Sequence, residues 1–236
     1  CLSVENLVHL VHRQERATLT ELLPGPDQLA LQGPEGGFHH ELIVPFVRGE
    51  DLRPWYQEVE DKWLIFTRQG LDIGEHPSIV QHLERYRQSL EPKPKGYADA
   101  NPWPGRKAGS YRWHEIQDTV DYWQRFFEPK ILWPDLTQRP RWSWDDKGKF
   151  VGNTGFFIAP AEPWLLAVLQ SRATWFALGG VAQPLGERLG LTRYRLFTQF
   201  TERLPIPTMT DDDKAQLGAL AMRATTLAND RYTIDR

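Results

Sequence analysis

Apolar residues recur along this chain with two different periods, which separate the expected helices from the expected strands. Residues 3–17, 76–90 and 113–127 carry apolar side chains three and four positions apart, and residues 162–180 are apolar over one broad face before two closing glycines. This spacing is that of one face of an α-helix. We therefore expect helices in these segments, and another over residues 211–230, where three aspartates suit the positive end of a helix dipole.

Short runs of β-branched and aromatic residues predict the strands. They fall at residues 41–47, 62–67, 129–136, 140–144 and 149–160. The last two runs are joined by Asp145-Asp146-Lys147-Gly148, a typical turn sequence, so we expect them to form a hairpin. Strands mixed with helices predict a mixed α/β (α+β) fold, with a small twisted sheet flanked by helices and one helix at the C-terminal end.

Three segments fit no regular element. Residues 22–37 are punctuated by proline and glycine, and residues 91–112 are rich in proline, glycine and basic side chains, which predicts loops. Residues 188–207 are mixed in pattern and basic, and they end at the sequence Leu-Pro-Ile-Pro. We expect residues 91–112 to be exposed.

The composition is that of an ordinary globular protein. The 236 residues are 40% hydrophobic and 25% charged. No apolar run approaches the roughly 18 residues of a membrane span, and the first residues lack a signal-peptide pattern, so we expect a soluble, cytoplasmic protein with no membrane partner. Cys1 is the only cysteine, which leaves no internal disulfide and no thiolate cluster. Because the first residue is not Met, we expect a piece of a longer protein.

Charge is distributed unevenly along the chain. The net charge of −3 is not that of a strong independent nucleic-acid binder. Residues 1–62, however, hold 5 basic and 11 acidic side chains, whereas residues 81–112 hold 7 basic and 3 acidic ones, and residues 187–203 hold 4 against 2. The basic side chains therefore concentrate in two segments that fit no regular element.

One group of residues matches a catalytic pattern. Asp135 follows a proline, and ten residues later comes Asp145-Asp146-Lys147. A PD-(D/E)xK nuclease uses two such carboxylates to hold Mg²⁺ and the lysine to orient the attacking water. The alternative is a hairpin tip that projects these charges into water. The pattern is short and no helix-borne glutamate is placed upstream, so we expect no catalytic residue here and keep the nuclease as an alternative.

Other candidates for chemistry are weaker. Asn101-Pro102-Trp103 is similar to the Asn-Pro-Pro-aromatic loop with which amino-methyltransferases hold a flipped base, but the second proline is missing and no glycine-rich turn is present to bind S-adenosylmethionine. His39 and His40 are adjacent, and His9 and His12 lack ligands at metal-binding spacing. We expect no metal and no cofactor in this chain.

A succession of blocks carries a resemblance that no single block would. In order, they are VPFVRGEDLRPW, KWLIFT, HPSIVQHLERYRQSL, FEPKILWPDL, FVGNTGFFIAP, WLLAVLQSRATWF and LPIP. This order resembles the TaqI-like C-terminal specificity domain of N6-adenine DNA methyltransferases, of fused type II restriction–modification enzymes and of related phage-defence methyltransferases. The most family-like positions are Arg48-Gly49-x-Asp51, Pro129-Lys130-Ile131 and Gln170-Ser171, although the family usually has Asn-Ser at the last.

The resemblance implies a division of labour. Residues 42–207 would be the target recognition domain, preceded by a helix and connecting segment over residues 1–41 and followed by a helix over residues 208–236. This chain would read double-stranded DNA without a catalytic centre of its own. A methyltransferase domain of the same parent protein would bind S-adenosylmethionine and perform the chemistry.

Cations in the basic segments have the chemistry that DNA reading needs. Arg and Lys pair with guanine and neutralise phosphates. The candidates are Lys93, Lys95, Arg106, Lys107, Arg112, Arg139, Arg141, Arg193 and Arg195, together with Arg48 and Lys130 from the family-like blocks. For Arg48 and Lys130 the alternative is an ion pair with Asp51 or Asp135. A module that holds another protein of a defence complex through exposed aromatic rings is the second alternative, given the ten tryptophans.

Overall fold

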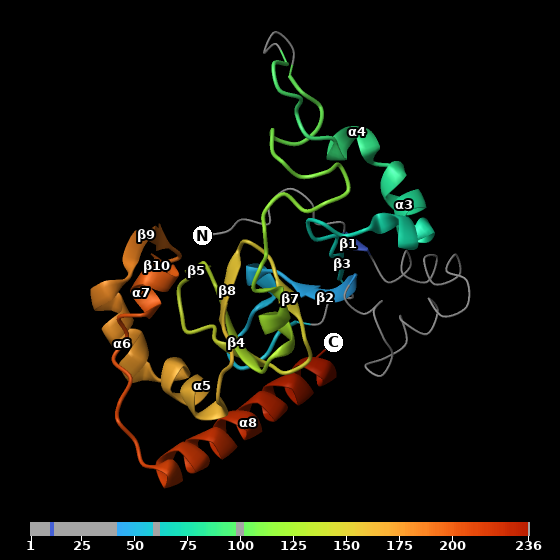
Figure 1. Cartoon of the computed structure of the whole chain (residues 1–236). Coiled ribbons are helices and arrows are strands. Elements are labelled where there is room, and N and C mark those ends of the chain that lie inside the picture. Colours follow the sequence, from blue (N-terminus) through green and yellow to red (C-terminus); the bar gives the residue numbers. More distant parts are fainter. Residues whose placement is uncertain (1–9, 12–41, 59–61, 98–101, 236) are drawn as a thin grey trace. The chain divides into compact units, whose positions relative to one another are not determined.

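The computed structural model describes residues 10–11, 42–58, 62–97 and 102–235 (Figure 1). These residues divide into two compact units. Unit 1 combines residues 46–58 with residues 122–235, and unit 2 contains the other described residues. Among the described residues, no helix is long and apolar enough to cross a bilayer.

Unit 1 is built around β4 (Lys130–Pro134), whose five residues are all buried. β4 lies between two antiparallel neighbours, β6 (Ser143–Asp145) and β8 (Gly155–Ile158). A central strand that is covered on both faces needs apolar side chains pointing both ways, and the Ile-Leu-Trp run of β4 supplies them. The predicted strand over residues 129–136 is therefore confirmed.

The main hydrophobic core of unit 1 joins β4 to two helices. Trp133 and Trp142, with ring centroids 4.9 Å apart, pack with Leu166 of α5 (Pro163–Gln170) and Leu178 of α6 (Arg172–Val181). The Trp133 indole N–H donates to the carbonyl of Leu196 at 2.8 Å, which satisfies its one polar group inside the core. These rings stabilise the fold and are not available to a partner.

Residues 162–180 form two helices, where one was expected. Ser171 has an extended backbone, and its hydroxyl accepts the N–H of Thr174 at 3.1 Å, so it ends α5 and caps α6. The preceding Gln170 accepts the backbone N–H of Trp142 at 3.1 Å. The Gln-Ser pair thus caps one helix and ties the other to the segment before β6.

A second small sheet in unit 1 is formed by β5 (Leu136–Thr137), β10 (Leu191–Arg195) and β9 (Gln183–Arg188), in that order and all antiparallel. Figure 1 shows it beside α6 and the short α7 (Thr198–Thr201). The basic segment that fitted no regular element in the sequence is therefore mostly a β-hairpin.

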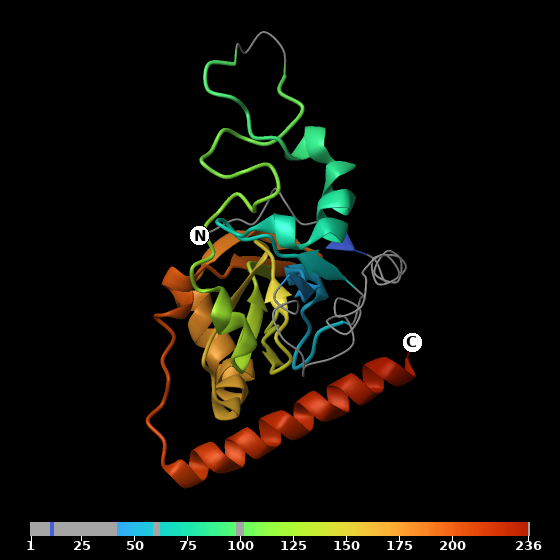
Figure 2. The ribbon, with the colours of Figure 1, turned by 45° about the vertical axis from the view of Figure 1, so that its right-hand side comes forward.

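The expected C-terminal helix is confirmed as α8 (Asp211–Ile234). The Thr210 hydroxyl accepts the N–H of Asp213, and the Asp213 carboxylate accepts the N–H of Thr210, which is a reciprocal cap at the helix start. Figures 1 and 2 both show α8 as one straight rod, and it packs against α5.

Strand β2 (Ile43–Val47) belongs to both units along its length. In unit 2 its first three residues pair antiparallel with β3 (Trp63–Ile65), which also pairs with β1 (Leu10–Val11). In unit 1 its last two residues pair parallel with β7 (Phe150–Val151). The predicted strands at residues 41–47 and 62–67 are confirmed. The helix predicted over residues 3–17 is wrong at β1, and the rest of that segment lies outside the described residues.

The remaining helices of unit 2 follow β3. After the 3-10 turn η3 (Ile73–Glu75) come α3 (Pro77–Glu84) and α4 (Arg87–Leu90), which confirm the helical prediction for residues 76–90 except for a break at residues 85–86. Residues 91–112 contain no helix or strand where the structure describes them, as expected of a loop.

Two local predictions are wrong. The expected helix over residues 113–127 is present only as the 3-10 helix η4 (Trp123–Phe127), because Arg106 takes the carbonyls that a helix would use. The expected hairpin after Asp145 does not form, since β6 pairs with β4 whereas β7 pairs with β2. Even so, helices and small sheets are mixed throughout, which confirms the mixed α/β fold class.

Candidate nucleic-acid interface

The eleven predicted cations differ widely in what their charged groups do. Five lie in unit 2, on the loop after α4, and six lie in unit 1. A cation can contact DNA only if its charged group reaches the surface and is not already committed to the protein.

Lys130 of unit 1 is committed to the protein interior. It has 0% exposure, and its ammonium donates to the Asp145 carboxylate and the Phe126 carbonyl, both at 2.5 Å. Burial lowers the pKa of Lys130, and the attraction of Asp145 opposes that shift. The structure does not support a DNA contact by Lys130. Its partner is Asp145, and not Asp51 or Asp135, the two carboxylates that the sequence suggested.

The ion pair between Lys130 and Asp145 argues against the nuclease pattern. Asp145 is 2% exposed and also accepts the N–H of Lys149 at 3.0 Å, so it does not sit on an exposed turn tip. Asp145 faces Lys130 at one end of β4, whereas Asp135 follows the other end, about 17 Å away at the rise of a strand. Two carboxylates so far apart cannot share one Mg²⁺. Within the described part of the chain, no group of three or more His, Cys, Asp and Glu residues could hold a metal ion.

Arg106 organises the loop of unit 2 from inside. It is 5% exposed, and its guanidinium donates to four backbone carbonyls, those of Leu90, Arg112, Trp113 and Glu115, at 2.6 to 3.0 Å. Burial lowers the pKa of Arg106 to about 10. Because all these donors are used internally, Arg106 holds the loop in shape, and the structure does not support a DNA contact by this side chain.

The other loop cations are more accessible. Lys95, Lys107 and Arg112 are exposed, and Arg112 has an acidic neighbour, Glu115, at 3.9 Å. Lys93 is half-buried, with its ammonium 5.7 Å from the centre of the Tyr97 ring. The loop thus presents exposed cations on a backbone that Arg106 fixes.

The family-like block around Arg48 is a tight turn in unit 1. The Asp51 carboxylate accepts the N–H of Arg48 at 2.7 Å, and Gly49 approaches Thr154 so closely that a Cβ would lie 2.0 Å from the Thr154 carbonyl oxygen. The half-buried Arg48 side chain pairs with Glu50 at 3.1 Å. Structural requirements therefore explain the glycine and the aspartate, and the Arg48 guanidinium remains partly accessible.

Arg141 lies in a cluster of like charges. Its guanidinium donates to the carbonyls of Leu52 and Glu50 at 2.7 and 3.0 Å. Burial lowers the pKa of Arg141, and the nearby positive charges of Arg53 and Arg139 lower it further. Arg139 is exposed and forms no ion pair with a described residue. The carboxylates of Glu58 and Asp51 offset the repulsion between these guanidiniums, and Arg53 itself pairs with Glu58 at 2.6 Å.

Arg193 and Arg195 share one face of β10 with Leu191, because side chains alternate along a strand. Tyr194 points to the opposite face, where its ring packs edge-on against Trp175 at 5.7 Å. Arg193 and Arg195 are half-buried, and their Nε–H groups are buried without a hydrogen-bond acceptor among the described residues. Arg195 also lies 5.0 Å from the centre of the Phe197 ring.

Sequence reasoning missed Arg188, which is exposed and faces Leu191 across the hairpin, on the same face as these arginines. The sequence feature that could have revealed this hairpin is Leu189-Gly190, a two-residue turn between two strands. Leucine in place of the usual Asn or Asp hid that turn.

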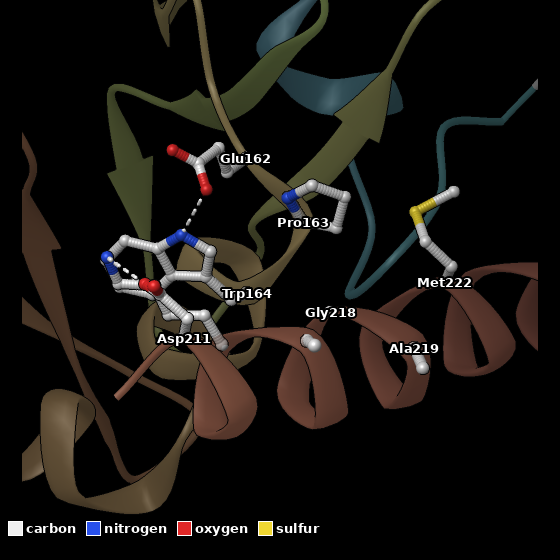
Figure 3. Close-up of a pocket in the computed structure, with 9 residues that line it drawn as sticks. Glu162, Pro163, Trp164, Asp211, Gly218, Ala219 and Met222 are labelled. Atoms are coloured by element: carbon white, nitrogen blue, oxygen red, sulfur yellow. Dashed lines mark hydrogen bonds and ion pairs between the residues drawn. The ribbon is translucent and has the colours of Figure 1, made fainter. Parts of the chain in front are cut away.

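A groove of about 620 Å³ lies between the start of α5 and the first half of α8. Figure 3 shows Glu162 above the Trp164 ring, and the indole N–H donates to its carboxylate at 2.8 Å. Small residues, Gly218 and Ala219, form much of the α8 side. The charged residues that line the groove are Glu162, Asp211 and Lys214.

The structure also bears on two other candidates from the sequence, the Asn101-Pro102-Trp103 motif and a protein-docking surface of aromatic rings. The Trp103 indole donates to the Glu91 carbonyl at 3.0 Å, while Asn101 of the same motif lies outside the described residues, as do His9, His12, His39 and His40. No tryptophan is among the exposed large hydrophobic residues of the described chain, but Tyr86, Tyr122, Phe127 and Phe176 are, so a protein contact through exposed aromatic rings stays an alternative.

Comparisons relate the chain to restriction–modification proteins. No family model matches it. It is 24% identical over 183 residues to the type II methyltransferase M.BanIII of Aneurinibacillus aneurinilyticus, in an alignment that covers 71% of this chain and 29% of that protein. Its fold is similar to part of the Type IIL restriction–modification enzyme MmeI, solved in complex with DNA, with a TM-score of 0.52 and 16% identity over 90% of this chain and 25% of that one. The chain thus spans less than a third of either protein.

Proposed function

We propose that this chain is a sequence-reading DNA recognition module of a restriction–modification or phage-defence N6-adenine DNA methyltransferase, of the TaqI-like type. The observation that carries the proposal is the hairpin face that combines the exposed Arg188 with the half-buried Arg193 and Arg195. The solved relative, MmeI, is a restriction–modification enzyme in complex with DNA, which supports the same role.

Under this proposal, some cationic side chains contact DNA and others only stabilise the fold of the module. Lys95, Lys107 and Arg112 on the loop and Arg139 on the strand connection are exposed and suited to phosphates. The arginines of the hairpin have the planar donor geometry that pairs with phosphates, and the same geometry can pair with guanine, worth about 1–3 kcal/mol of discrimination per good pair. Lys93, Arg48 and Arg141 are partly accessible and would contribute less. Lys130 and Arg106 act as internal supports.

Chemistry would belong to another part of the parent protein. The methyltransferase relative is more than three times the length that this chain covers, which leaves room for a domain that binds S-adenosylmethionine and transfers the methyl group. The recognition module would position that domain on double-stranded DNA and hold it there through phosphate contacts, while the target adenine leaves the base stack. The module itself needs no metal and no cofactor for this role.

Salt-dependent binding of the whole chain to a fluorescent duplex of roughly 30 base pairs tests the proposal, at about 50 and about 200 mM salt. The slope of log K against log salt should become shallower by about 0.9 for each phosphate contact that a substitution removes. Arg193→Ala with Arg195→Ala should weaken binding, whereas Arg223→Ala, on the exposed surface of α8, is the matched control. A wild-type chain without any salt-dependent binding would remove the proposal.

Sequence reading is tested in the parent protein. Exchanging residues 42–207 for the equivalent segment of a relative should change which sites are methylated without abolishing methyl transfer. Unchanged site preference after the exchange would show that another part of the parent reads the sequence.

A further inference from the structure

An apolar side chain stands at the tip of the basic hairpin. Leu189 is 91% exposed, with a backbone φ of 54°, and the next residue, Gly190, has a φ of 73°. A two-residue hairpin turn with positive φ at both positions favours Asn, Asp or Gly, because their side chains tolerate this conformation. Leucine at this place is unfavourable for the backbone and for solvation alike, so neither turn formation nor solubility explains it.

The tip is held rigidly. The side-chain amide of Gln138, next to β5, donates to the carbonyls of Arg188 and Leu191 at 2.5 and 2.8 Å, which clamps both sides of the turn. β10 is hydrogen-bonded to β5 on one side and to β9 on the other. Leu189 is therefore presented in a fixed position, and little conformational freedom is lost when it inserts into a binding partner.

Positive charge follows directly behind the tip. Arg188 precedes Leu189, and Arg193 and Arg195 lie further down the same hairpin face, beyond the 55%-exposed Leu191. Glu187 is the only acidic residue between Gln183 and Arg195. An apolar point backed by a row of guanidiniums matches a partner that is apolar inside and anionic outside, which describes stacked base pairs between phosphate backbones.

We propose that the hairpin enters a groove of duplex DNA and that Leu189 inserts between two base pairs, while the arginines behind it neutralise the flanking phosphates. The inference rests on the proposed function and specifies the site and mode of contact. Inserting a side chain requires two base pairs to unstack, and the cost of unstacking depends on sequence. The hairpin would thus select for an easily unstacked step, such as a pyrimidine–purine step, without a hydrogen bond to either base.

A mismatch tests insertion without knowledge of the recognised sequence. The probes are two duplexes of identical sequence, one fully paired and one with a single central mismatch, because a mismatched step unstacks at lower cost. The wild-type chain should bind the mismatched duplex roughly tenfold more tightly, and 2-aminopurine beside the mismatch should brighten on binding as it loses its stacking neighbour.

Leu189→Asn is the informative variant because asparagine suits the turn and keeps the hairpin folded. It should lose the mismatch preference and the 2-aminopurine signal while keeping the salt slope of the wild type. Arg193→Ala with Arg195→Ala should show the reverse: weaker binding to both duplexes with the preference retained. Circular dichroism spectra that match the wild type would confirm that each variant is folded.

The outcomes separate the two proposals. If Leu189→Asn keeps the full mismatch preference, or if the wild type binds both duplexes equally, insertion is wrong although DNA recognition stands. If the wild type binds neither duplex in a salt-dependent way, the proposed function itself fails. If Leu189→Asn binds both duplexes as the wild type does but no longer associates with the rest of the parent protein, the tip is a protein contact and the inference is overturned.

Discussion

The buried pair of Lys130 and Asp145 makes the sharpest stability prediction for this protein. Lys130→Met preserves the length and apolar stem of the side chain but removes the ammonium. The variant leaves the Asp145 carboxylate, 2% exposed, without its ion-pair partner, and it leaves the Phe126 carbonyl without the donor that it has now.

The magnitude follows from the two groups left behind. Breaking a buried ion pair by removing one partner costs about 3–5 kcal/mol. The remaining hydrogen bond to Asp145, from the N–H of Lys149, reduces the cost toward the lower end of that range. We expect Lys130→Met to destabilise unit 1 by about 3 kcal/mol or more. Lys130→Met combined with Asp145→Leu should recover most of the loss, because a pair of apolar side chains leaves no buried charge.

Urea unfolding followed by circular dichroism measures these differences, provided that tryptophan fluorescence gives the same transition. A comparison with Lys147→Met, which removes an exposed lysine two residues beyond Asp145, separates burial from loss of charge as such. A cost below about 1 kcal/mol for Lys130→Met would refute the reasoning, since that is the size of a surface ion pair.

The remaining predictions concern pH, a helix cap and a close backbone approach. Burial lowers the pKa of His114 below its ordinary value, so as pH falls the unfolded chain binds this proton before the folded chain does. The free energy of unfolding should therefore fall as pH drops below about 6.5, by up to 1.4 kcal/mol per pH unit for one proton. Urea titrations at several pH values should show that His114→Phe removes this pH dependence. Ser171→Ala should lower the free energy of unfolding by about 1 kcal/mol because it removes the α6 cap. The control variant Ser110→Ala, at an exposed position, should leave the free energy of unfolding unchanged in urea titrations. Gly49→Ala should lower stability by about 1–3 kcal/mol, measured by thermal unfolding, because its Cβ would meet the Thr154 carbonyl; a neutral result would mean that the turn can open.

The sequence predicted those helices and strands that are determined by residues close to one another in the chain. Strands β2, β3 and β4 and helix α8 follow from alternation, apolar runs and caps that are visible in the sequence. The break at Ser171 was missed because the apolar pattern runs on through residues 162–180, while the decision rests on one hydroxyl. Residues 113–122 have helical periodicity, but the Arg106 guanidinium binds the carbonyls of Trp113 and Glu115 at the start of this segment, and such a contact cannot be read from a period.

The candidate interface shows the same division. The sequence identified which side chains carry positive charge and which segments, the loop and the later hairpin region, contain them. It could not say that Lys130 and Arg106 point inward, because burial depends on strand pairing and on carbonyls brought together by the fold. The hairpin tip was missed for a related reason, since Leu189 occupies a turn position where its residue type is unusual.

Arg106 has a consequence for engineering. One side chain ties together the carbonyls of residues 90, 112, 113 and 115, so the loop keeps its course without any helix or strand of its own. The neighbouring positions Lys95, Lys107 and Arg112 point to solvent and contribute little to that course. A library randomised at those positions, with Arg106 retained, would therefore vary the chemistry of the surface while every member inherits the same framework.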